Sequence, residues 1–246
     1  MPETHEMPIV RRGFLTGALL LPAAARAARA QESWEEKHQR QLKEDWPWLG
    51  RYAADNEKLL ASGRKVDIVF MGDSITEGWR DKHPVFFTPG RVCRGIGGQT
   101  TPQMVLRMMA DVIALRPRLI HIMAGTNDIA GNTGKITIPQ SCDNLRMMTE
   151  LAQANGIRVL LASVPPADHF PWRPGLETVQ PIRTINAWLA DYARRARATH
   201  VDYTGVLATQ AGAMKSGMAF DGVHPTEQGY AAMESVLAPV LKAHKA

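Results

Sequence analysis

The fold is decided by the stretch at residues 66–74, which reads Val-Asp-Ile-Val-Phe-Met-Gly-Asp-Ser. Residues 66–71 form a short, largely apolar run that is rich in β-branched and aromatic side chains. A run of this kind predicts a buried strand. The change to Gly72-Asp73-Ser74 predicts a turn into a helix, with Ser74 at the helix N-terminus.

Strand-like and helix-like patterns alternate outward from this stretch. Four further strands are expected, at about Arg91, Leu119, Val159 and His200. Helical patterns occupy residues 102–115, 144–154, 177–197 and 226–242. Alternation with short turns favours a parallel sheet that is covered by helices on both faces. The predicted fold class is therefore α/β, a single three-layer α/β/α sandwich around a five-stranded parallel sheet.

The first thirty residues have the pattern of an export signal. Arg11-Arg12 stand directly before an apolar run at residues 14–25, and small residues allow cleavage after Ala27 or Ala30. This order is typical of a twin-arginine signal peptide, and a frayed amphipathic helix is the alternative. We expect the twin-arginine export machinery as a partner and a periplasmic or secreted protein. The run is too short to span a bilayer, so no stable membrane insertion is expected after signal removal.

The rest of the chain divides into two predicted parts. A strongly helical pattern starts at Ser33, and Pro47 can open a second helix that runs to about Leu60 and stops at Ser62-Gly63. Residues 31–63 are therefore predicted to form an N-terminal helical arm, and residues 64–246 the main domain.

Composition and charge exclude several classes of protein. With 246 residues, 45% hydrophobic and 22% charged, the chain is an ordinary globular protein rather than a disordered or fibrous one. Removal of residues 1–30 takes away four Arg and two Glu and lowers the net charge from +5 to +3. The one basic cluster, Arg194-Arg195-Ala196-Arg197, has no interleaved aromatics, so a solvated helix face is favoured over nucleic-acid binding.

The cysteines and histidines show no metal-binding pattern. Cys93 and Cys142 lack metal spacing, and two plain core residues are expected in preference to a disulfide. His121 stands on an apolar strand and is predicted to be a hydrogen-bonded core residue. Five other histidines lack metal spacing, namely His38, His83, His169, His200 and His244. No metal site is predicted.

The residues that follow the strands carry the candidate chemistry, because ligands bind beyond the carboxyl ends of the strands in open parallel sheets. Ser74 follows the first strand, a Gly-rich turn at Gly95–Gly98 follows the second, and Asn127-Asp128 follow the third. Taken alone, a serine at this point is usually an N-cap, and an Asn-Asp pair is usually a β-turn. The Gly-rich turn lacks the Gly-Lys-Ser/Thr that would indicate phosphate binding.

A serine hydroxyl needs a base, and His224 is the best placed histidine for this role. It stands in a loop before the closing helix, three residues after Asp221, so the carboxylate can accept from one imidazole nitrogen while the other faces Ser74. The Gly-rich turn Gly95–Gly98 offers unobstructed backbone N–H groups and Asn127 a side-chain amide, and such groups can stabilise an oxyanion. Taken alone, Asp221 could equally form an Asx-turn and His224 a solvent-facing cap.

Four segments together resemble the ordered blocks of the SGNH (GDSL) hydrolase family. They are Gly72-Asp73-Ser74-Ile75, Gly98 within Gly-Ile-Gly-Gly-Gln-Thr-Thr, Gly125-Thr126-Asn127-Asp128 and Asp221-Gly222-Val223-His224-Pro225. The resemblance extends over residues 66–243 and is greatest to bacterial lysophospholipase-like and platelet-activating-factor-acetylhydrolase-like members. It implies a flavodoxin-like fold, with residues 64–246 as the SGNH hydrolase domain. The chain departs from the family at Cys93-Arg94-Gly95, where the block often begins with Asn, and at Gln99, where Asp is common.

The resemblance also implies roles for individual residues. Ser74 is expected to be the nucleophile, His224 the base and Asp221 the residue that orients His224. The oxyanion hole is expected to comprise the Ser74 N–H, the Gly98 N–H and the Asn127 side chain. No cofactor is needed, because every role has a protein group.

The expected activity is hydrolysis of a small-molecule ester through an acyl-enzyme, with loss of activity as the pH falls through the histidine range near about 6.5. We expect short-chain esters, such as acetyl esters, of carbohydrates or small alcohols. The alternatives are a lysophospholipase or thioesterase for longer acyl chains and a non-catalytic binding module. Trp79, His83, Phe86, Phe87 and the loop at residues 168–173 either wall the crevice or cover the edge of the sheet.

Overall fold

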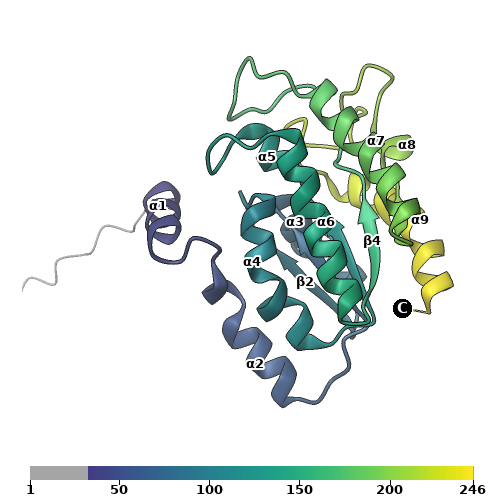
Figure 1. The fold of residues 1–246 in the computed structure, drawn as a ribbon. Coiled ribbons are helices and arrows are strands. Elements are labelled where there is room, and N and C mark those ends of the chain that lie inside the picture. The colour runs from purple at the N-terminus through teal and green to yellow at the C-terminus, as the bar shows by residue number, and fades with distance from the viewer. Residues whose placement is uncertain (1–32, 246) are drawn as a thin grey trace, which may run out of the picture.

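A five-stranded parallel sheet forms the centre of the molecule in the computed structural model, which describes residues 33–245 (Figure 1). Its strands are β1 (Ile68–Gly72), β2 (Arg91–Gly95), β3 (Leu119–Met123), β4 (Arg158–Ala162) and β5 (Thr199–Val201). The strand order is β2-β1-β3-β4-β5, and all neighbouring pairs are parallel. This is the flavodoxin-like order. The predicted α/β fold with five parallel strands is confirmed.

Helices cover both faces of the sheet. Helices α4 (Thr101–Asp111), α6 (Ile138–Ala154) and α7 (Val179–Arg195) pack side by side on one face, and Figure 1 shows α4 and α6 in front of the strands. Helices α3 (Ser74–Lys82) and α9 (Glu227–His244) pack together on the other face. The short helices α5 (Thr126–Ala130) and α8 (Thr204–Leu207) follow β3 and β5, and the 3-10 turns η2 (Pro84–Phe86) and η3 (Ile113–Leu115) follow α3 and α4.

Several predicted helix ends differ from the structure for local reasons. Helix α6 starts at Ile138 rather than Asn144, because Thr137 and Gln140 form a reciprocal capping box and proline occupies the first turn. The helix predicted over residues 102–115 ends at Asp111 and continues only as the separate turn η3. The helix predicted over residues 47–60 is divided, because Trp48 adopts a left-handed conformation with φ of 54° before η1.

The central strand β1 is buried over its whole length, as a parallel strand between two helical layers must be. Two glycines then let the carboxyl ends of the strands meet helix α3. A Cβ at Gly72 would clash with the Thr76 side chain, and one at Gly95 with the backbone of Glu77. These close approaches bring the first turn of α3 against the ends of β1 and β2, where the candidate site lies.

Trp79 and its aromatic neighbours belong to the core, so the interpretation that they wall the crevice is wrong. Trp79 is fully buried, stacks on Phe86 at 4.9 Å between ring centroids, and donates Nε1–H to Glu234. Phe87 packs against Phe70, and His83 bonds Glu234 at 2.6 Å. The alternative interpretation, that these residues cover the sheet, is the correct one. Trp79 is five residues after Ser74, which turns it to the inward face of α3.

Part of the predicted N-terminal arm packs firmly on the body. It contains α1 (Trp34–Glu44), the 3-10 turn η1 (Leu49–Arg51) and α2 (Ala53–Ala61). Helix α2 contacts α4, and Asn56 Nδ2 donates to Asp111 Oδ1 at 2.8 Å. Helix α1 stands apart from the helical layers in Figure 1. The predicted export signal at residues 1–30 lies outside the described residues.

Other predicted features have direct structural counterparts. Cys93 and Cys142 are buried and not bonded to each other. His121 is fully buried with Nε2 2.9 Å from the Tyr203 hydroxyl, and burial lowers the pKa of His121 to about 3. The predicted core position of His121 is confirmed, but only Nε2 is hydrogen-bonded, because Nδ1 is buried without a partner among the described residues.

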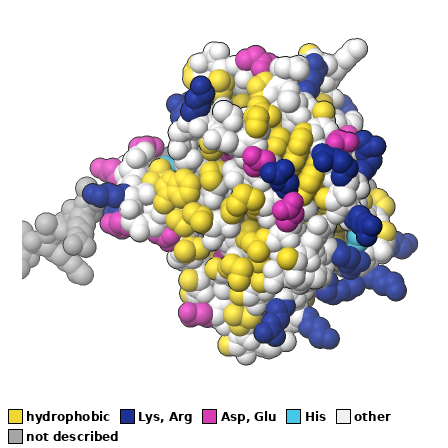
Figure 2. All heavy atoms as spheres, viewed as in Figure 1, with side chains coloured by type: hydrophobic (Ala, Val, Ile, Leu, Met, Phe, Trp, Pro, Cys, Tyr) yellow, Lys and Arg dark blue, Asp and Glu magenta, His cyan; other side chains and the backbone are white. Residues whose placement is uncertain are grey.

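Charged side chains are distributed unevenly over the surface. Arg194 and Arg195 are exposed and pair with Asp191 on the same helix. Figure 2 shows Lys and Arg gathered on the side of α7 and α9, and acidic side chains around α1. Within residues 33–245, no helix is long and apolar enough to cross a membrane, and no group of three or more His, Cys, Asp or Glu could hold a metal ion.

Candidate active site

Ser74 is the first residue of α3, directly beyond the carboxyl end of β1. The cap of this helix is Asp73 and not Ser74, because Asp73 Oδ1 accepts from the Ile75 N–H at 2.9 Å. The Ser74 hydroxyl therefore does not serve as the cap. Burial raises the pKa of Asp73 to about 6, although the Ile75 hydrogen bond and the charge of His224 oppose this rise.

The structure brings Ser74, His224 and Asp221 into one chain of hydrogen bonds. The Ser74 Oγ lies 2.9 Å from His224 Nε2. On the other side of the ring, His224 Nδ1 lies 2.7 Å from Asp221 Oδ2. Because an ionised carboxylate only accepts hydrogen bonds, Nδ1 carries the proton and Nε2 is left to accept from the serine.

Asp221 is held in place by its own loop. Its Oδ1 accepts from the backbone N–H of Val223 at 3.0 Å and of His224 at 2.8 Å, while Gly222 takes a positive φ of 86°. Partial burial acts to raise the pKa of Asp221, but the hydrogen bonds from His224 and Val223 outweigh it and lower the pKa below its usual value. The carboxylate therefore stays ionised at neutral pH.

The turn after β2 presents the backbone of Gly98 to the site. Gly98 has a φ of 77°, a conformation that side chains disfavour, and a hydrogen bond from Gly97 N–H to Glu77 Oε2 at 2.8 Å holds the turn. Glu77 also accepts from Arg51 of the arm at 2.8 Å, and the Tyr52 hydroxyl donates to the Gly95 carbonyl. Hydrogen bonds among the described residues leave the N–H groups of Ser74 and Gly98 unused.

Asn127 is the third predicted oxyanion residue, and its amide is oriented by neighbours on both sides. Its Nδ2 donates to the Gln99 carbonyl at 3.0 Å, and its Oδ1 accepts from Asn132 Nδ2 at 2.7 Å. Asn132 in turn accepts from Trp172 Nε1 at 3.2 Å. Exchanging the oxygen and nitrogen of Asn127 would set two carbonyl oxygens against each other at Gln99, which fixes this orientation. The second Nδ2 proton is used in neither of these two hydrogen bonds.

Asn132 was not among the residues predicted from sequence. It reaches Asn127 because α5 ends after one turn at Gly131, which has a φ of 68°. Asn132 N–H then donates to the Asn127 carbonyl. A five-residue helix within an apparent β-turn gives no periodic signal, so local pattern could not have found this contact.

Asp128 and Gln99 hold the site together without facing its chemistry. Asp128 Oδ1 accepts from Thr101 N–H at 2.7 Å, which ties the start of α4 to α5. The carboxylate also accepts from the Thr101 hydroxyl. Burial raises the pKa of Asp128, against the effect of these hydrogen bonds. Gln99, where the chain departs from the family pattern, donates to the Pro47 carbonyl of the arm at 2.8 Å.

A cavity of about 580 Å³ opens in front of Ser74 and His224. Gly98 and Asn127 border it, as do Trp172 and Arg173 of the loop at residues 168–173. Only the end of that loop, Trp172 and Arg173, is among the described residues that line the cavity, and Phe170 earlier in the loop is buried in the core. None of the described residues that line this cavity carries an aliphatic side chain.

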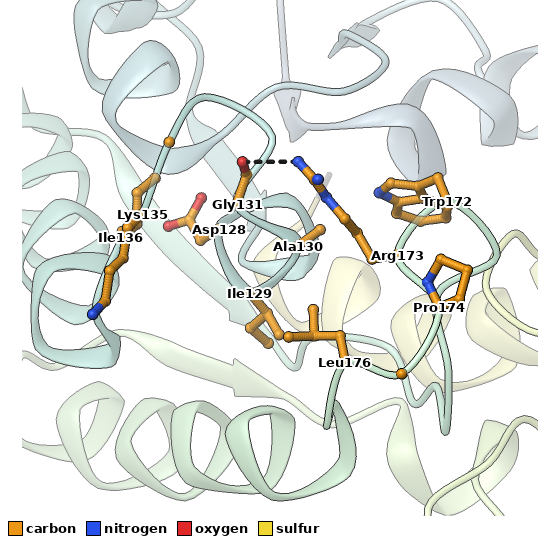
Figure 3. A pocket seen from close by; sticks show the side chains of 12 residues that line it. Asp128, Ile129, Ala130, Gly131, Lys135, Ile136, Trp172, Arg173, Pro174 and Leu176 are labelled. Carbon is orange, nitrogen blue, oxygen red and sulfur yellow. Dashed lines mark hydrogen bonds between the residues drawn. The ribbon is translucent and has the colours of Figure 1, made fainter.

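A second cavity, of about 740 Å³, also has Trp172 and Arg173 in its lining (Figure 3). Arg173 donates to the Gly131 carbonyl at 3.2 Å, the contact drawn as a dashed line. Ile129, Ile136 and Leu176 also border this cavity. These three side chains are aliphatic, whereas the described residues that line the cavity at Ser74 include no aliphatic side chain.

Known proteins resemble the chain in both sequence and structure. The model of the GDSL-like lipase/acylhydrolase family matches residues 70–232. A crystal structure from Bacteroides fragilis, described as an acylhydrolase, is 42% identical with a TM-score of 0.76, and the match covers 81% of this chain and 98% of that one. A GDSL-like lipase from Bacteroides thetaiotaomicron is 40% identical with the same TM-score, covering 81% of this chain and 99% of that one.

Curated relatives match over shorter stretches. The uncharacterized lipoprotein YqeF of Bacillus subtilis is 39% identical over 41% of this chain and 49% of its own length. The chain thus spans about half the length, or less, of the curated relatives it matches. The family model itself covers well over half of the chain and includes Ser74, Gly98, Asn127, Asp221 and His224. The chain therefore belongs to the GDSL-like lipase/acylhydrolase family, a family of carboxylic ester hydrolases.

Proposed function

We propose that the protein is a serine ester hydrolase that cleaves short-chain esters, such as acetyl esters, of carbohydrates or small alcohols. The observation that carries the proposal is the hydrogen-bonded chain Ser74–His224–Asp221 beside a cavity whose described lining includes no aliphatic side chain. A serine activated in this way attacks carbonyl carbon, and unused N–H groups beside it can hold the resulting anion.

In the first half of the reaction, His224 Nε2 takes the proton of Ser74 Oγ as Oγ bonds to the ester carbonyl carbon. The carbonyl oxygen becomes an oxyanion and accepts from the N–H groups of Ser74 and Gly98 and from Asn127 Nδ2. When this intermediate collapses, the bond to the alkoxy oxygen breaks. The proton held by His224 passes to that oxygen, the alcohol leaves, and the acyl group remains on Ser74.

Water completes the cycle by the same steps. His224 Nε2 takes a proton from water as its oxygen bonds to the acyl carbon. Collapse then returns the proton to Ser74 Oγ and releases the carboxylic acid. The ionised Asp221 carboxylate keeps Nδ1–H in place and stabilises the imidazolium formed in each half. The protein groups account for each proton transfer, so the proposed route uses no metal or organic cofactor.

The lining of the cavity supports a small acyl group on a polar alcohol. A long acyl chain or a lipid alcohol gains its affinity by burying aliphatic surface, which this lining does not offer. The neighbouring cavity favours a second candidate function, because Ile129, Ile136 and Leu176 could take a longer acyl chain there (Figure 3). A lysophospholipase or thioesterase activity would use that cavity.

The test compares hydrolysis of p-nitrophenyl acetate, butyrate and decanoate by the wild-type protein and by Ser74→Ala. We expect the acetate to be the best substrate and the variant to lose at least about 10⁴-fold in kcat. Ser235→Ala, which changes an exposed serine on α9, is the control and should be fully active. A decanoate preference would favour the longer-chain activity, and an active Ser74→Ala variant would contradict the serine mechanism.

Export is part of the proposed function. Its support is the sequence of residues 1–30, with Arg11-Arg12 before an apolar run, together with the relation to YqeF, which is described as a lipoprotein. We propose twin-arginine export to the periplasm or the medium. Replacing both arginines with lysine should leave the protein in the cytoplasmic fraction, and unchanged export would contradict this route.

A further inference from the structure

Helix α1 forms a wall of the cavity at Ser74, although it lies outside the part of the chain that the family model matches. Ser33 caps the helix and makes a reciprocal capping box with Glu36. With the first turn fixed in this way, positions 35, 38 and 39 fall on one face, since residues three and four apart are neighbours on a helix. Glu35, His38 and Gln39 all border the cavity.

The helix lies close to the reacting groups. A Cβ placed on Gly98 would be 3.7 Å from His38 Cε1, so the His38 ring lies next to the proposed oxyanion residue. Figure 1 shows α1 standing off from the helical layers. Residues of α1 border the cavity together with Ser74, His224 and Trp172. A substrate bound at Ser74 therefore has α1 on one side and Trp172 on another.

The segment that connects α1 to the body is anchored rather than loose. The carbonyl of Trp46 accepts from Gln103 Nε2 at 2.6 Å, and the carbonyl of Pro47 accepts from Gln99 Nε2 at 2.8 Å. At the end of α1, the Asp45 carboxylate accepts from the N–H groups of Leu49 and Gly50. These contacts fix the direction in which α1 leaves the body, so its cavity face is a built part of the site.

The groups on this wall suit hydroxyl groups. Gln39 Nε2 donates to Glu35 Oε1 at 2.8 Å, which leaves the other Glu35 oxygen and the Gln39 carbonyl oxygen as acceptors. Across the cavity, Trp172 is 36% exposed and offers an indole face, and Arg173 offers guanidinium donors. One carboxylate and one guanidinium facing the same space favour a neutral polar group over an anion or a cation.

The size of the cavity assigns this wall to the alcohol part of the ester. An acetyl group has only two carbons, so most of a cavity of about 580 Å³ remains for the alcohol. The alkoxy oxygen must also lie within reach of His224 Nε2, which protonates it on departure. His224 borders the same cavity as Glu35 and Gln39.

We propose that Glu35 and Gln39 of α1 form an alcohol subsite that binds a neutral, polyhydroxylated leaving group of the size of a sugar ring. The carboxylate and the amide oxygen accept hydrogen bonds from its hydroxyls, and Trp172 packs against its ring face. This inference rests on the proposed ester hydrolysis at Ser74. It goes beyond that function by assigning the choice of the alcohol to helix α1.

The test uses two acetyl esters that differ only in the alcohol, methyl 6-O-acetyl-glucopyranoside and ethyl acetate, with acetate release followed by pH-stat titration. The variant is Glu35→Gln combined with Gln39→Ala. The matched control is Lys43→Ala, which changes an exposed residue of the same helix that does not line the cavity. Thermal unfolding of each variant checks that the fold is retained.

We expect wild type to prefer the glucoside ester at least about tenfold in kcat/KM, and the double variant to lose about tenfold on that ester alone through KM. Its activity on ethyl acetate and that of Lys43→Ala on both esters should stay within about twofold of wild type. An equal loss on both esters, no loss on the glucoside, or a wild type without the preference would overturn the subsite. If Ser74→Ala still hydrolyses both esters, the proposed function fails instead.

Discussion

Replacing Asn132 tests how the amide of Asn127 is oriented. Asn132 Nδ2 donates to Asn127 Oδ1 at 2.7 Å, and the Gln99 carbonyl accepts from Asn127 Nδ2 at 3.0 Å. Asn132→Ala removes the first contact and leaves the second, so Asn127 keeps most of its orientation. One neutral hydrogen bond is worth about 0.5–1.5 kcal/mol, and we expect kcat to fall about three- to tenfold.

Asn132→Asp should be far more damaging, although it is nearly isosteric. It sets a carboxylate oxygen against Asn127 Oδ1. Rotation of the Asn127 amide turns Nδ2 towards the new carboxylate and sets Oδ1 against the Gln99 carbonyl, and it is favoured because a hydrogen bond to a charged group is stronger than one to a neutral carbonyl. The oxyanion then loses that donor. Loss of one oxyanion donor costs about 2.7–4 kcal/mol in other hydrolases, so we expect kcat to fall about 10²-fold or more with KM nearly unchanged.

Initial rates on p-nitrophenyl acetate for Asn127→Ala, Asn132→Asp and the double variant separate orientation from a general charge effect. If Asn132 acts through Asn127, the double variant is no slower than Asn127→Ala, and the coupling energy nearly equals the whole effect of Asn132→Asp. Asn155→Asp, at an exposed position beyond α6, controls for added negative charge. Additive losses, or a fully active Asn132→Asp variant, would refute the reasoning.

Two stability predictions follow from buried groups near the site. Burial raises the pKa of Asp73 from 3.8 to about 6, so the folded protein holds this proton to a higher pH than the unfolded chain, and the free energy of unfolding falls as pH rises between these values. Asp73→Asn keeps the acceptor for the Ile75 N–H. In urea unfolding, the free energy of unfolding of this variant should exceed that of wild type by about 3 kcal/mol at pH 8 and should be about the same as that of wild type at pH 4. A difference that stays constant with pH would contradict this prediction. Tyr52→Phe removes the hydrogen bond to the Gly95 carbonyl and should lower the free energy of unfolding by about 1–3 kcal/mol and kcat several-fold, whereas Tyr192→Phe on α7 should leave kcat unchanged. Equal kcat losses in both tyrosine variants would contradict the idea that Tyr52 holds the Gly98 turn in place through its hydrogen bond to Gly95.

The residues that meet at the site were predictable from position along the chain. Ser74 and His224 are 150 residues apart, yet their side chains lie 2.9 Å apart. For Ser74 the reason is that parallel strands in an α/β sheet end on the same edge. His224 follows no strand directly and was predicted from its place in the loop before the closing helix, three residues after Asp221. Any residue that directly follows one of these strands is brought there by the topology.

Residues on helix faces were less predictable. Trp79 was expected as either a crevice wall or a sheet cover, and its five-residue offset from Ser74 along α3 decides for the core. The short helix α5 and the left-handed residue Trp48 also gave no periodic signal. Both set the direction of the chain close to the site, and a one-residue change of direction is outside the reach of a hydrophobic pattern.

By itself, the sequence determined the α/β class, the five-stranded parallel sheet and the strand-end residues Ser74, Gly98 and Asn127 that contribute to the site. These depend on local periodicity and on a topology rule, which are properties of neighbouring residues. Only the tertiary structure decided three contacts. Asn132 orients Asn127, Arg51 and Tyr52 hold the turn that contains Gly98 in place, and α1 forms one wall of the cavity. The physical reason is that hydrogen bonds act over about 3 Å, and which groups come that close is settled by how the elements pack in space.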